Sequence, residues 1–322
     1  MMTAQETPVT ALGDILGKGH EIFIKRDDLL PFSFGGNKVR IAEAFVRDMK
    51  ARGDDAMIFY GDRCSNLCRV LANICAIEEI PAIMIAAKAH GRADIEPFNS
   101  RLIRQFGVPV LDCESGGIAE AVDEAFARLR AMGRRPYYIY GNRLGTGNEA
   151  VAARAYAEAY RGIAAWEEAH GMTFDLIAVP YGTGATLSGL ICGALEAGTP
   201  RPIVGLSISS RTYERAYGLL REGIAGYLRE HGRDFDEAAE SMIRLETRFN
   251  KGGYGLYDEE VEAMIAFMMT RTGIPMDPTY TAKAFLGLKH YLEEEGRSFK
   301  NVLFIHTGGT PLYFDYLTES GR

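Results

Sequence analysis

The lysine at position 38 is the first residue whose context suggests chemistry. It lies in FSFGGNKVRIAEAF, residues 32–45, where two glycines and an asparagine precede a helix-like run. A lysine after a turn is ordinarily a solvated surface residue. The alternative is a reactive amine, because burial and a helix N-terminus both disfavour the ammonium form and lower a lysine pKa from its usual value of about 10.4. Other parts of the chain decide between these two roles.

A glycine-rich loop, YGTGATLSG at 181–189, follows an apolar run of strand character and opens a helix. Glycines let backbone N–H groups turn toward one point, and the helix N-terminus adds partial positive charge. The loop lacks the Gly-Lys-Ser/Thr of a Walker loop and the spacing of a dinucleotide loop, so a nicotinamide cofactor is disfavoured. A structural glycine turn is the alternative to a monophosphate cradle, which would be formed by Gly182, Thr183, Gly184, Ala185 and Thr186.

A monophosphate cradle combined with a lysine at a helix start indicates one cofactor, pyridoxal 5'-phosphate. Its aldehyde forms a Schiff base with a lysine amine, which gives Lys38 a chemical role. We expect the two glycines of FGGNKVR to let the chain pass close to the flat cofactor.

Three further loops carry polar side chains that such a site needs. Ser65 and Asn66 end GDRCSN (61–66), but no G-x-S-x-G elbow surrounds Ser65, and either residue can simply cap the helix that begins near Leu67. Tyr254 lies between glycines in KGGYGLYDEE (251–260), and Tyr280 lies in DPTYTAKA (277–284). Both tyrosines are candidate site residues, with half-buried packing as the ordinary alternative.

The elements that must position these residues alternate along the chain. Apolar runs of strand character occupy 21–25, 56–60, 82–86, 137–140, 175–180, 202–208 and 301–306, and helical patterns include 41–52, 119–132, 149–169 and 258–273. Apolar strands separated by helices predict parallel sheets covered on both faces, and so many units predict an α/β fold with two open twisted sheets. Ligands bind at the carboxyl ends of such strands, where the loops described above begin.

Composition argues against several other classes of protein. The 322 residues carry 36 Lys and Arg against 43 Asp and Glu, without a basic tail, so we expect no nucleic-acid partner. No apolar run is long enough to span a bilayer and no signal peptide is evident, so we expect no membrane association and a cytoplasmic location. Five cysteines, without histidines near them in sequence, predict reduced thiols and no metal site.

Several motifs, in order along almost the whole chain, resemble those of the aminocyclopropane-carboxylate deaminase/D-cysteine desulfhydrase family. These are pyridoxal-phosphate enzymes of the tryptophan-synthase-β fold type, also called fold type II. The matching segments are RDDL (26–29), FGGNKVR (34–40), CSN (64–66), YGTGATLSG (181–189), GYGL (253–256), DPTYTAKA (277–284) and HTGGTP (306–311). The resemblance implies a homodimer and a small domain, 45–159, inserted in a large cofactor-binding domain, 1–44 and 160–322.

The resemblance also implies roles for individual residues. Lys38 matches the lysine that forms the Schiff base and moves the proton at Cα, and Ser65 matches the serine on the opposite cofactor face. Asn66 matches the partner of the ring hydroxyl, and residues 182–186 match the phosphate loop. Tyr254 and Tyr280 match the tyrosines that face the substrate. Thr281 matches the partner of the pyridine nitrogen, and a neutral hydroxyl there favours α-proton removal and β-elimination over transamination.

This chain also departs from the family pattern beside Ser65. Cys64 replaces the usual glutamine, and Leu67 replaces the polar residue that usually follows the asparagine. Arg63 and Arg143 lie in two loops near the expected site, and a guanidinium suits a carboxylate or sulfonate. We therefore expect Ser65, Asn66 and Leu67 to contact substrate and hypothesise that Arg63 and Arg143 bind a second acidic group. The alternative is that both arginines point to solvent or pair with Asp62 and Glu149.

The sequence thus predicts a pyridoxal-phosphate-dependent lyase, or deaminase, that acts on a small amino acid. The expected reaction is β-elimination from a D-cysteine-like, sulfonated or acidic substrate, which gives a 2-oxo acid and ammonia. The alternatives are ring opening of aminocyclopropane-carboxylate and β-replacement in a specialised biosynthetic pathway. A cofactor-binding protein without catalysis is the rival from another class, and Lys38, Ser65 and the two tyrosines argue against it.

Overall fold

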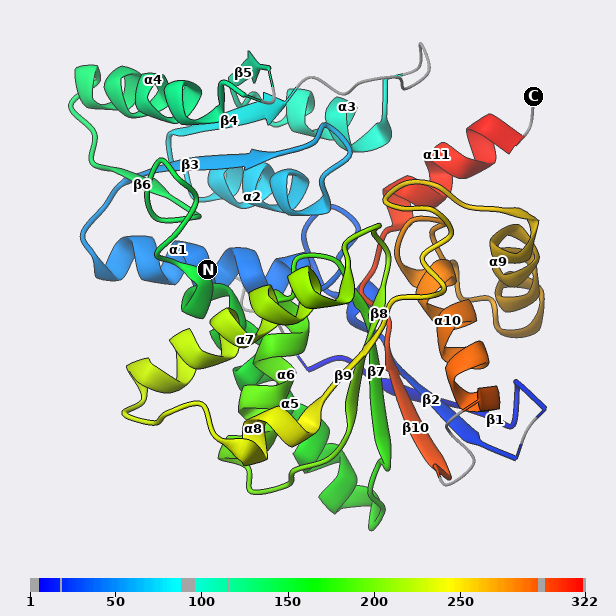
Figure 1. Ribbon diagram of the computed structural model, residues 1–322. Helices are drawn as coiled ribbons and strands as arrows, with labels where there is room; N and C mark the ends of the chain where they lie inside the picture. The colour runs from blue at the N-terminus through cyan, green and yellow to red at the C-terminus, as the bar shows by residue number, and fades with distance from the viewer. Residues whose placement is uncertain (1–5, 18, 88–95, 115, 295–298, 321–322) are drawn as a thin grey trace.

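The computed structural model of the protein describes residues 6–17, 19–87, 96–114, 116–294 and 299–320. It contains two sheets, each flanked by helices (Figure 1). The larger sheet has the strand order β1 (Val9–Gly13), β2 (Glu21–Lys25), β10 (Asn301–Ile305), β7 (Leu176–Tyr181), β8 (Ile203–Ser207) and β9 (Ile243–Glu246). The smaller sheet has the order β5 (Val110–Cys113), β4 (Ala82–Ala87), β3 (Ala56–Gly61) and β6 (Pro136–Tyr138).

Nearly all of the strand pairs are parallel, and only β1 runs antiparallel to its neighbour among the described strands. The central strands are continuous apolar runs because helices cover both faces; every residue of β7 is buried. The helices are α1 (Lys38–Ala51), α2 (Asn66–Ile77), α3 (Phe98–Gln105), α4 (Ile118–Ala131), α5 (Glu149–His170), α6 (Ala185–Glu196), α7 (Tyr213–Glu230), α8 (Glu237–Met242), α9 (Glu259–Thr272), α10 (Thr281–Glu294) and α11 (Thr310–Ser320).

The predicted α/β fold with two mostly parallel sheets is confirmed, and each predicted apolar run contains a strand. The run at 137–140 forms a strand only as far as Tyr138. Three strands escaped prediction, namely β1, β5 and β9, and all three lie at sheet edges. The predicted domain boundaries at 44/45 and 159/160 fall inside α1 and α5, and the division into domains stays a prediction.

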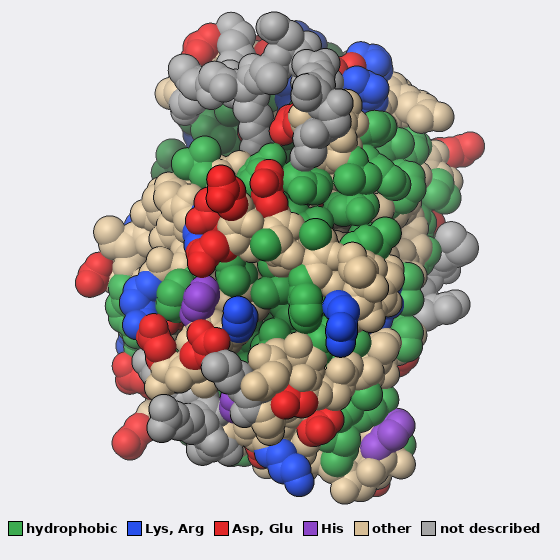
Figure 2. Space-filling model, turned by 90° about the vertical axis from the view of Figure 1, so that its right-hand side faces the viewer, with side chains coloured by type: hydrophobic (Ala, Val, Ile, Leu, Met, Phe, Trp, Pro, Cys, Tyr) green, Lys and Arg blue, Asp and Glu red, His purple; other side chains and the backbone are tan. Residues whose placement is uncertain are grey.

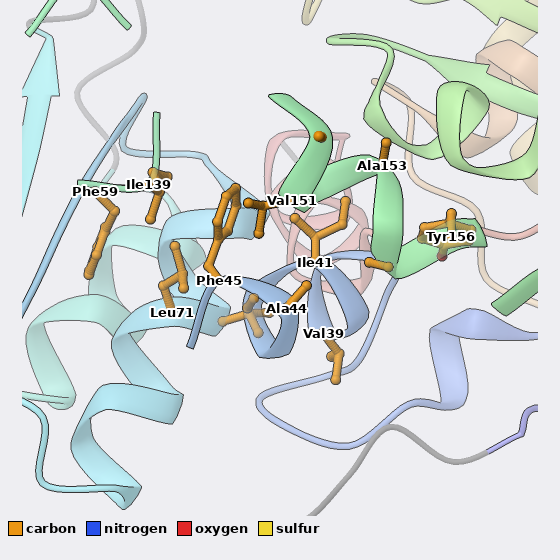
Figure 3. Close-up of a cluster of buried hydrophobic side chains, with 14 of the residues drawn as sticks. Val39, Ile41, Ala44, Phe45, Phe59, Leu71, Ile139, Val151, Ala153 and Tyr156 are labelled. Carbon is orange, nitrogen blue, oxygen red and sulfur yellow. The ribbon is translucent and has the colours of Figure 1, made fainter. Parts of the chain in front are cut away.

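Helix α1 lies between the two sheets and joins their cores (Figure 1). Figure 3 shows Phe45 of α1 near Phe59 of β3, Ile139 directly after β6 and Leu71 of α2, while Ile41 faces α5. These side chains belong to one continuous buried cluster. The N-terminus of α1, which carries Lys38, is therefore held by packing on both sides.

A second buried core lies between the large sheet and helices α9 and α10. On the face shown in Figure 2, hydrophobic side chains gather in the upper half of the molecule. The exposed apolar side chains include Phe34, which contacts Phe314 of α11 edge to face, and Leu317. Their exposure alone does not identify a partner, and the homodimer stays a prediction.

The described residues include no helix that is both long and apolar enough to cross a bilayer. The five cysteines are buried thiols, and the described part of the chain has no cluster of three or more metal-ligating side chains.

Helices α5 and α6 approach closely because Gly189 of α6 has no side chain. A Cβ at this position would overlap the Ala153 carbonyl and the Cβ of Tyr156, both on α5. Gly226 of α7 is also helical, but a Cβ there would meet open space. The two glycines form a matched pair for substitution. Both carry the backbone-entropy cost of a glycine inside a helix, but only Gly189 is in close contact with a neighbouring helix.

We expect Gly189→Ala to lower the free energy of unfolding by about 1–3 kcal/mol through overpacking. Gly226→Ala should instead raise it by about 0.5–1 kcal/mol, because alanine loses less backbone entropy in a helix. Urea unfolding followed by circular dichroism measures both changes. Equal effects of the two substitutions would contradict the packing account.

Candidate active site

A cavity of about 480 Å³ lies beside the carboxyl ends of β3, β7 and β8 and the N-termini of α1, α2 and α6. This is the edge at which parallel α/β sheets bind ligands. The predicted site residues that line it are Lys38, Ser65, Asn66, Leu67, Gly182, Thr183, Gly184, Ala185, Thr186, Tyr254 and Tyr280. Three predicted residues do not line it, namely Arg63, Arg143 and Thr281.

The glycine-rich loop presents backbone donors to this cavity. Gly184 caps α6 with a φ of 97°, a left-handed conformation that favours glycine. The first backbone bond of the helix runs from the N–H of Ser188 to the Gly184 carbonyl, so the N–H groups of Ala185, Thr186 and Leu187 have no acceptor within α6. Three such donors beside a positive helix end suit a phosphate group.

Lys38 is partly buried in the cavity wall at the first position of α1. Among the described residues its amine has no hydrogen-bond or ion-pair partner, and burial lowers its pKa to about 8. The preceding residue, Asn37, donates from Nδ2 to the Thr186 hydroxyl across 2.9 Å. This bond ties the lysine to the glycine-rich loop, so the amine and the phosphate donors have a fixed relative position.

The glycines before Lys38 do not serve the expected purpose. Neither Gly35 nor Gly36 lines the cavity. A Cβ on Gly36 would come 2.8 Å from the Thr307 carbonyl, and one on Gly35 would come 2.5 Å from the Leu30 carbonyl. The expectation that they lie close to the cofactor is wrong, because their small size instead admits neighbouring backbone.

The loop after β3 also presents donors at a helix N-terminus. Ser65 caps α2, since its hydroxyl accepts from the N–H of Cys68 at 3.2 Å. The N–H groups of Asn66 and Leu67 have no acceptor within the described residues. They lie at the positive end of α2, and such donors suit an anionic group such as a carboxylate. Ser65 both caps α2 and lines the cavity, so its role as a helix cap does not exclude a role in the site.

Tyr254 and Tyr280 form a pair at the cavity. Their hydroxyl oxygens lie 3.0 Å apart and their rings meet edge to face, with centroids 5.8 Å apart. Tyr254 is 38% exposed, whereas burial and the nearby Tyr254 hydroxyl raise the pKa of Tyr280 well above its ordinary value. The Tyr280 hydroxyl therefore keeps its proton near neutral pH.

Thr281 is fully buried, away from the cavity lining. Its hydroxyl donates to Asp277 Oδ1 at 2.8 Å and accepts from the Asp277 N–H at 2.8 Å. The single hydroxyl proton is thus used to close the turn that begins α10. The expected contact of Thr281 with a pyridine nitrogen does not agree with this geometry, whereas Thr307, in the loop after β10, does line the cavity.

Arg63 and Arg143 lie on the exterior, with side chains 40% and 50% exposed. Arg63 pairs with Asp112 at 2.5 Å, and Arg143 pairs with Asp123 at 3.1 Å. Both arginines therefore lie at the surface, as the alternative holds, but the acids that they pair with are not the expected Asp62 and Glu149. Neither guanidinium is placed to bind a second acidic group in the cavity.

Sequence reasoning missed two charged residues of the cavity, Arg211 and Asp62. Arg211 follows β8, and its Nη1 donates to the Gly182 carbonyl at 2.8 Å and to the Ser209 hydroxyl at 3.1 Å. Asp62 accepts from the N–H of Cys64 at 2.6 Å. The same strand-end rule that selected the other loops could have found both residues.

The residues present fit pyridoxal phosphate, since one cavity joins a partnerless amine of lowered pKa to a cradle of unsatisfied N–H donors. Such a site on two parallel sheets defines a pyridoxal-phosphate enzyme of fold type II. A family model described as "Pyridoxal-phosphate dependent enzyme" matches residues 2–308. The chain belongs to this family, and pyridoxal phosphate is its cofactor.

Particular relatives narrow the class. The D-cysteine desulfhydrase of Yersinia enterocolitica is 30% identical to this chain, over 96% of this chain and 92% of the relative. The D-cysteine desulfhydrase of Klebsiella pneumoniae is 31% identical, over 95% of this chain and 91% of the relative. A solved structure of an ACC deaminase homologue has a TM-score of 0.84 and 30% identity, with 98% and 93% coverage. The chain belongs to this desulfhydrase/deaminase family and is a pyridoxal-phosphate-dependent lyase, which confirms the predicted family, cofactor and enzyme class.

The lowered pKa of Lys38 gives a testable pH dependence. Only the neutral amine attacks an aldehyde, so trapping of added cofactor on the cofactor-free protein by borohydride should rise up to about pH 8 and then level off. An ordinary lysine, with a pKa of about 10.4, would continue to gain reactivity well above that pH. Peptide mass spectrometry of the reduced adduct identifies the modified lysine, and Lys38→Ala is the control.

Proposed function

We propose that the protein removes the α-proton of a small amino acid and eliminates its β-substituent, with D-cysteine as the best-matched substrate. For D-cysteine, the Cα–H and Cβ–S bonds break, one water is consumed, and pyruvate, ammonia and hydrogen sulfide form. The supporting observation is that one cavity holds the Lys38 amine, the N–H donors of α2 and the tyrosine pair. The likeness to two D-cysteine desulfhydrases adds support.

Lys38 is the proposed base. Pyridoxal phosphate supplies the electron sink that makes the Cα proton acidic. With a pKa of about 8, the free Lys38 amine is neutral in a substantial fraction of molecules near neutral pH and can accept that proton. The Asn37–Thr186 bond keeps this amine in place beside the phosphate loop.

The N-terminus of α2 is the proposed carboxylate site. The N–H groups of Asn66 and Leu67 bind and orient the substrate carboxylate, and the Ser65 hydroxyl lies in the same loop. Asp62 takes the Cys64 N–H and thereby fixes the loop. Fixing the carboxylate and the amine of the substrate determines which face of Cα meets Lys38.

The tyrosine pair is the proposed contact for the departing β-substituent. The Tyr280 hydroxyl stays protonated and donates a hydrogen bond to the sulfur as negative charge develops on it. Tyr254, at the more exposed side, then donates to the Tyr280 oxygen, which leaves the Tyr280 proton for the sulfur and orients that hydroxyl.

Ring opening of aminocyclopropane-carboxylate is a second candidate. The ACC deaminase homologue is as similar in identity as the desulfhydrases, and Ser65 and both tyrosines line the cavity. The two reactions differ in what leaves: elimination releases a β-substituent, whereas ring opening releases only ammonia. The products of the two substrates therefore discriminate the candidates.

We expect a screen of D- and L-amino acids, including aminocyclopropane-carboxylate, to show the fastest 2-oxo acid release from D-cysteine, with equimolar sulfide. Lys38→Ala should lower kcat by about 10²–10⁴-fold, because the proton acceptor at Cα is lost. Lys50→Ala is the matched control, since Lys50 lies on the same helix, outside the cavity lining, and pairs with Glu78.

Release of 2-oxo acid from aminocyclopropane-carboxylate but not from D-cysteine would contradict the first candidate. Trapping of the product by an added thiol, without 2-oxo acid, would instead support β-replacement.

If the substrate carries a sulfonate or a second acidic group, Arg211 is the arginine placed to bind it, rather than Arg63 or Arg143. Among the described residues Arg211 has no carboxylate partner, and it lines the cavity. We expect Arg211→Gln to lower kcat/KM for 3-sulfoalanine by about tenfold more than for D-cysteine, since a charge-assisted hydrogen bond contributes about 1.5–3 kcal/mol. Arg63→Gln is the surface control, and equal losses for both substrates would remove Arg211 from this role.

A further inference from the structure

Arg69 is a buried guanidinium that has no carboxylate partner among the described residues. It lies in the second turn of α2 and is 0% exposed. Its Nη2 donates to the Gly35 carbonyl at 2.9 Å, and its Nη1 donates to Asn66 Oδ1 at 3.2 Å. Its Nε has no hydrogen-bond partner. Buried charges are normally paired, as Arg40 is with Asp27. A buried guanidinium without a carboxylate partner is costly, which indicates a functional reason to retain it.

Asn99 of α3 completes the environment of Asn66. Its Nδ2 donates to Asn66 Oδ1 at 3.1 Å and to the Cys64 carbonyl at 2.6 Å. Its Oδ1 accepts from Arg69 Nη1 at 3.4 Å. The amide oxygen of Asn66 therefore receives two donors from the protein interior.

Two donors on one amide oxygen fix the orientation of Asn66. A flipped amide would place its NH₂ group against the donors of Arg69 and Asn99, so the bonds from both donors to Asn66 would be replaced by donor–donor contacts. With the oxygen turned inward, the NH₂ group is left for the cavity, which Asn66 lines. No partner for it is found in the described part of the chain.

We propose that Arg69 and Asn99 are positioning residues that hold the Asn66 NH₂ group toward the ring oxygen of the cofactor, and that the charge of Arg69 favours the ionised form of that oxygen. This inference rests on the proposed placement of the cofactor, with its ring hydroxyl at Asn66. A hydrogen-bond donor and a nearby positive charge both stabilise an anionic oxygen.

The same cluster braces two loops against each other. Arg69 holds Gly35, three residues before Lys38, while Asn99 holds Cys64, next to Ser65. The lysine loop and the α2 N-terminus are thus joined through one guanidinium and one amide. Burial lowers the pKa of Arg69 to about 9, so the guanidinium is charged in the neutral range.

The charge of Arg69 acts together with that of the other ionisable groups around the cavity. Asp62 is the single carboxylate among its described lining residues. It lies in the loop after β3, where its Oδ1 accepts from the Cys64 N–H. The remaining ionisable groups are Lys38, Tyr60, Tyr140, Tyr181, Arg211, Tyr254 and Tyr280 from the lining, with Cys64 and Cys68 behind it.

Two substitutions in the holoenzyme test the inference. Arg69→Met removes the charge and the fork of donors, and Asn99→Asp places a carboxylate beside the guanidinium with little change in volume. Both should lower the fraction of bound cofactor in the yellow form, whose ring hydroxyl is ionised, and weaken cofactor affinity by about tenfold. Visible absorbance at fixed pH and titration of the cofactor-free protein measure these effects.

The matched control is Arg201→Met. Arg201 is largely buried, with its side chain 8% exposed, but pairs with Glu167, and neither residue lines the cavity. It should lower the unfolding midpoint and leave the cofactor spectrum and affinity unchanged. If Arg69→Met does not fold, Asn99→Asp carries the test, since it retains the arginine.

A native spectrum and native affinity in folded Arg69→Met, or in Asn99→Asp, would overturn the inference. The readouts do not require a substrate, so an error in the proposed reaction leaves them interpretable. An error in the placement of Lys38 is detected separately, because the borohydride adduct would then lie on another residue.

Discussion

The position of Lys38 depends on one buried carboxylate, that of Asp27. Burial alone would raise the pKa of Asp27, but the charges of Arg40 and Lys25 outweigh it and lower the pKa. The carboxylate accepts from Arg40 on α1 and from Tyr156 on α5, while the Asp27 backbone carbonyl accepts from the N–H of Gly36. Both sides of the turn that carries Lys38 are thus attached to a single residue.

From that anchor, the active site is assembled by bringing helix N-termini together. Helices α1, α2 and α6 all begin at the cavity, and each helix end carries partial positive charge. Arg211 in the lining and the buried Arg69 beside Asn66 add cationic groups, against the one lining carboxylate of Asp62 within the described ranges. The cavity is therefore built for a ligand with several negative groups, which agrees with a phosphorylated cofactor and an amino acid carboxylate.

Features encoded locally could be predicted from the sequence, and features that depend on tertiary direction could not. Residues 182–186 and Lys38 were found because glycine spacing and strand-to-helix order are visible in the chain. The edge strands β1, β5 and β9 escaped because each includes exposed residues and lacks a continuous apolar run, unlike the edge strand β6. Thr281 and Arg63 share loops with site residues, yet their side chains turn toward Asp277 and Asp112, and no sequence pattern encodes that direction.

The donors at the α2 and α6 N-termini are backbone N–H groups. Side chains in these loops can therefore change during evolution while the donors are retained. Replacing a side chain at position 64 or 67 leaves the N–H groups of Asn66 and Leu67 in place. Cys64 and Leu67 can therefore differ from the glutamine and polar residue of the family pattern while the N–H donors of the proposed carboxylate site remain. Substrate preference in this fold is free to diverge by point mutation while the catalytic frame is inherited intact.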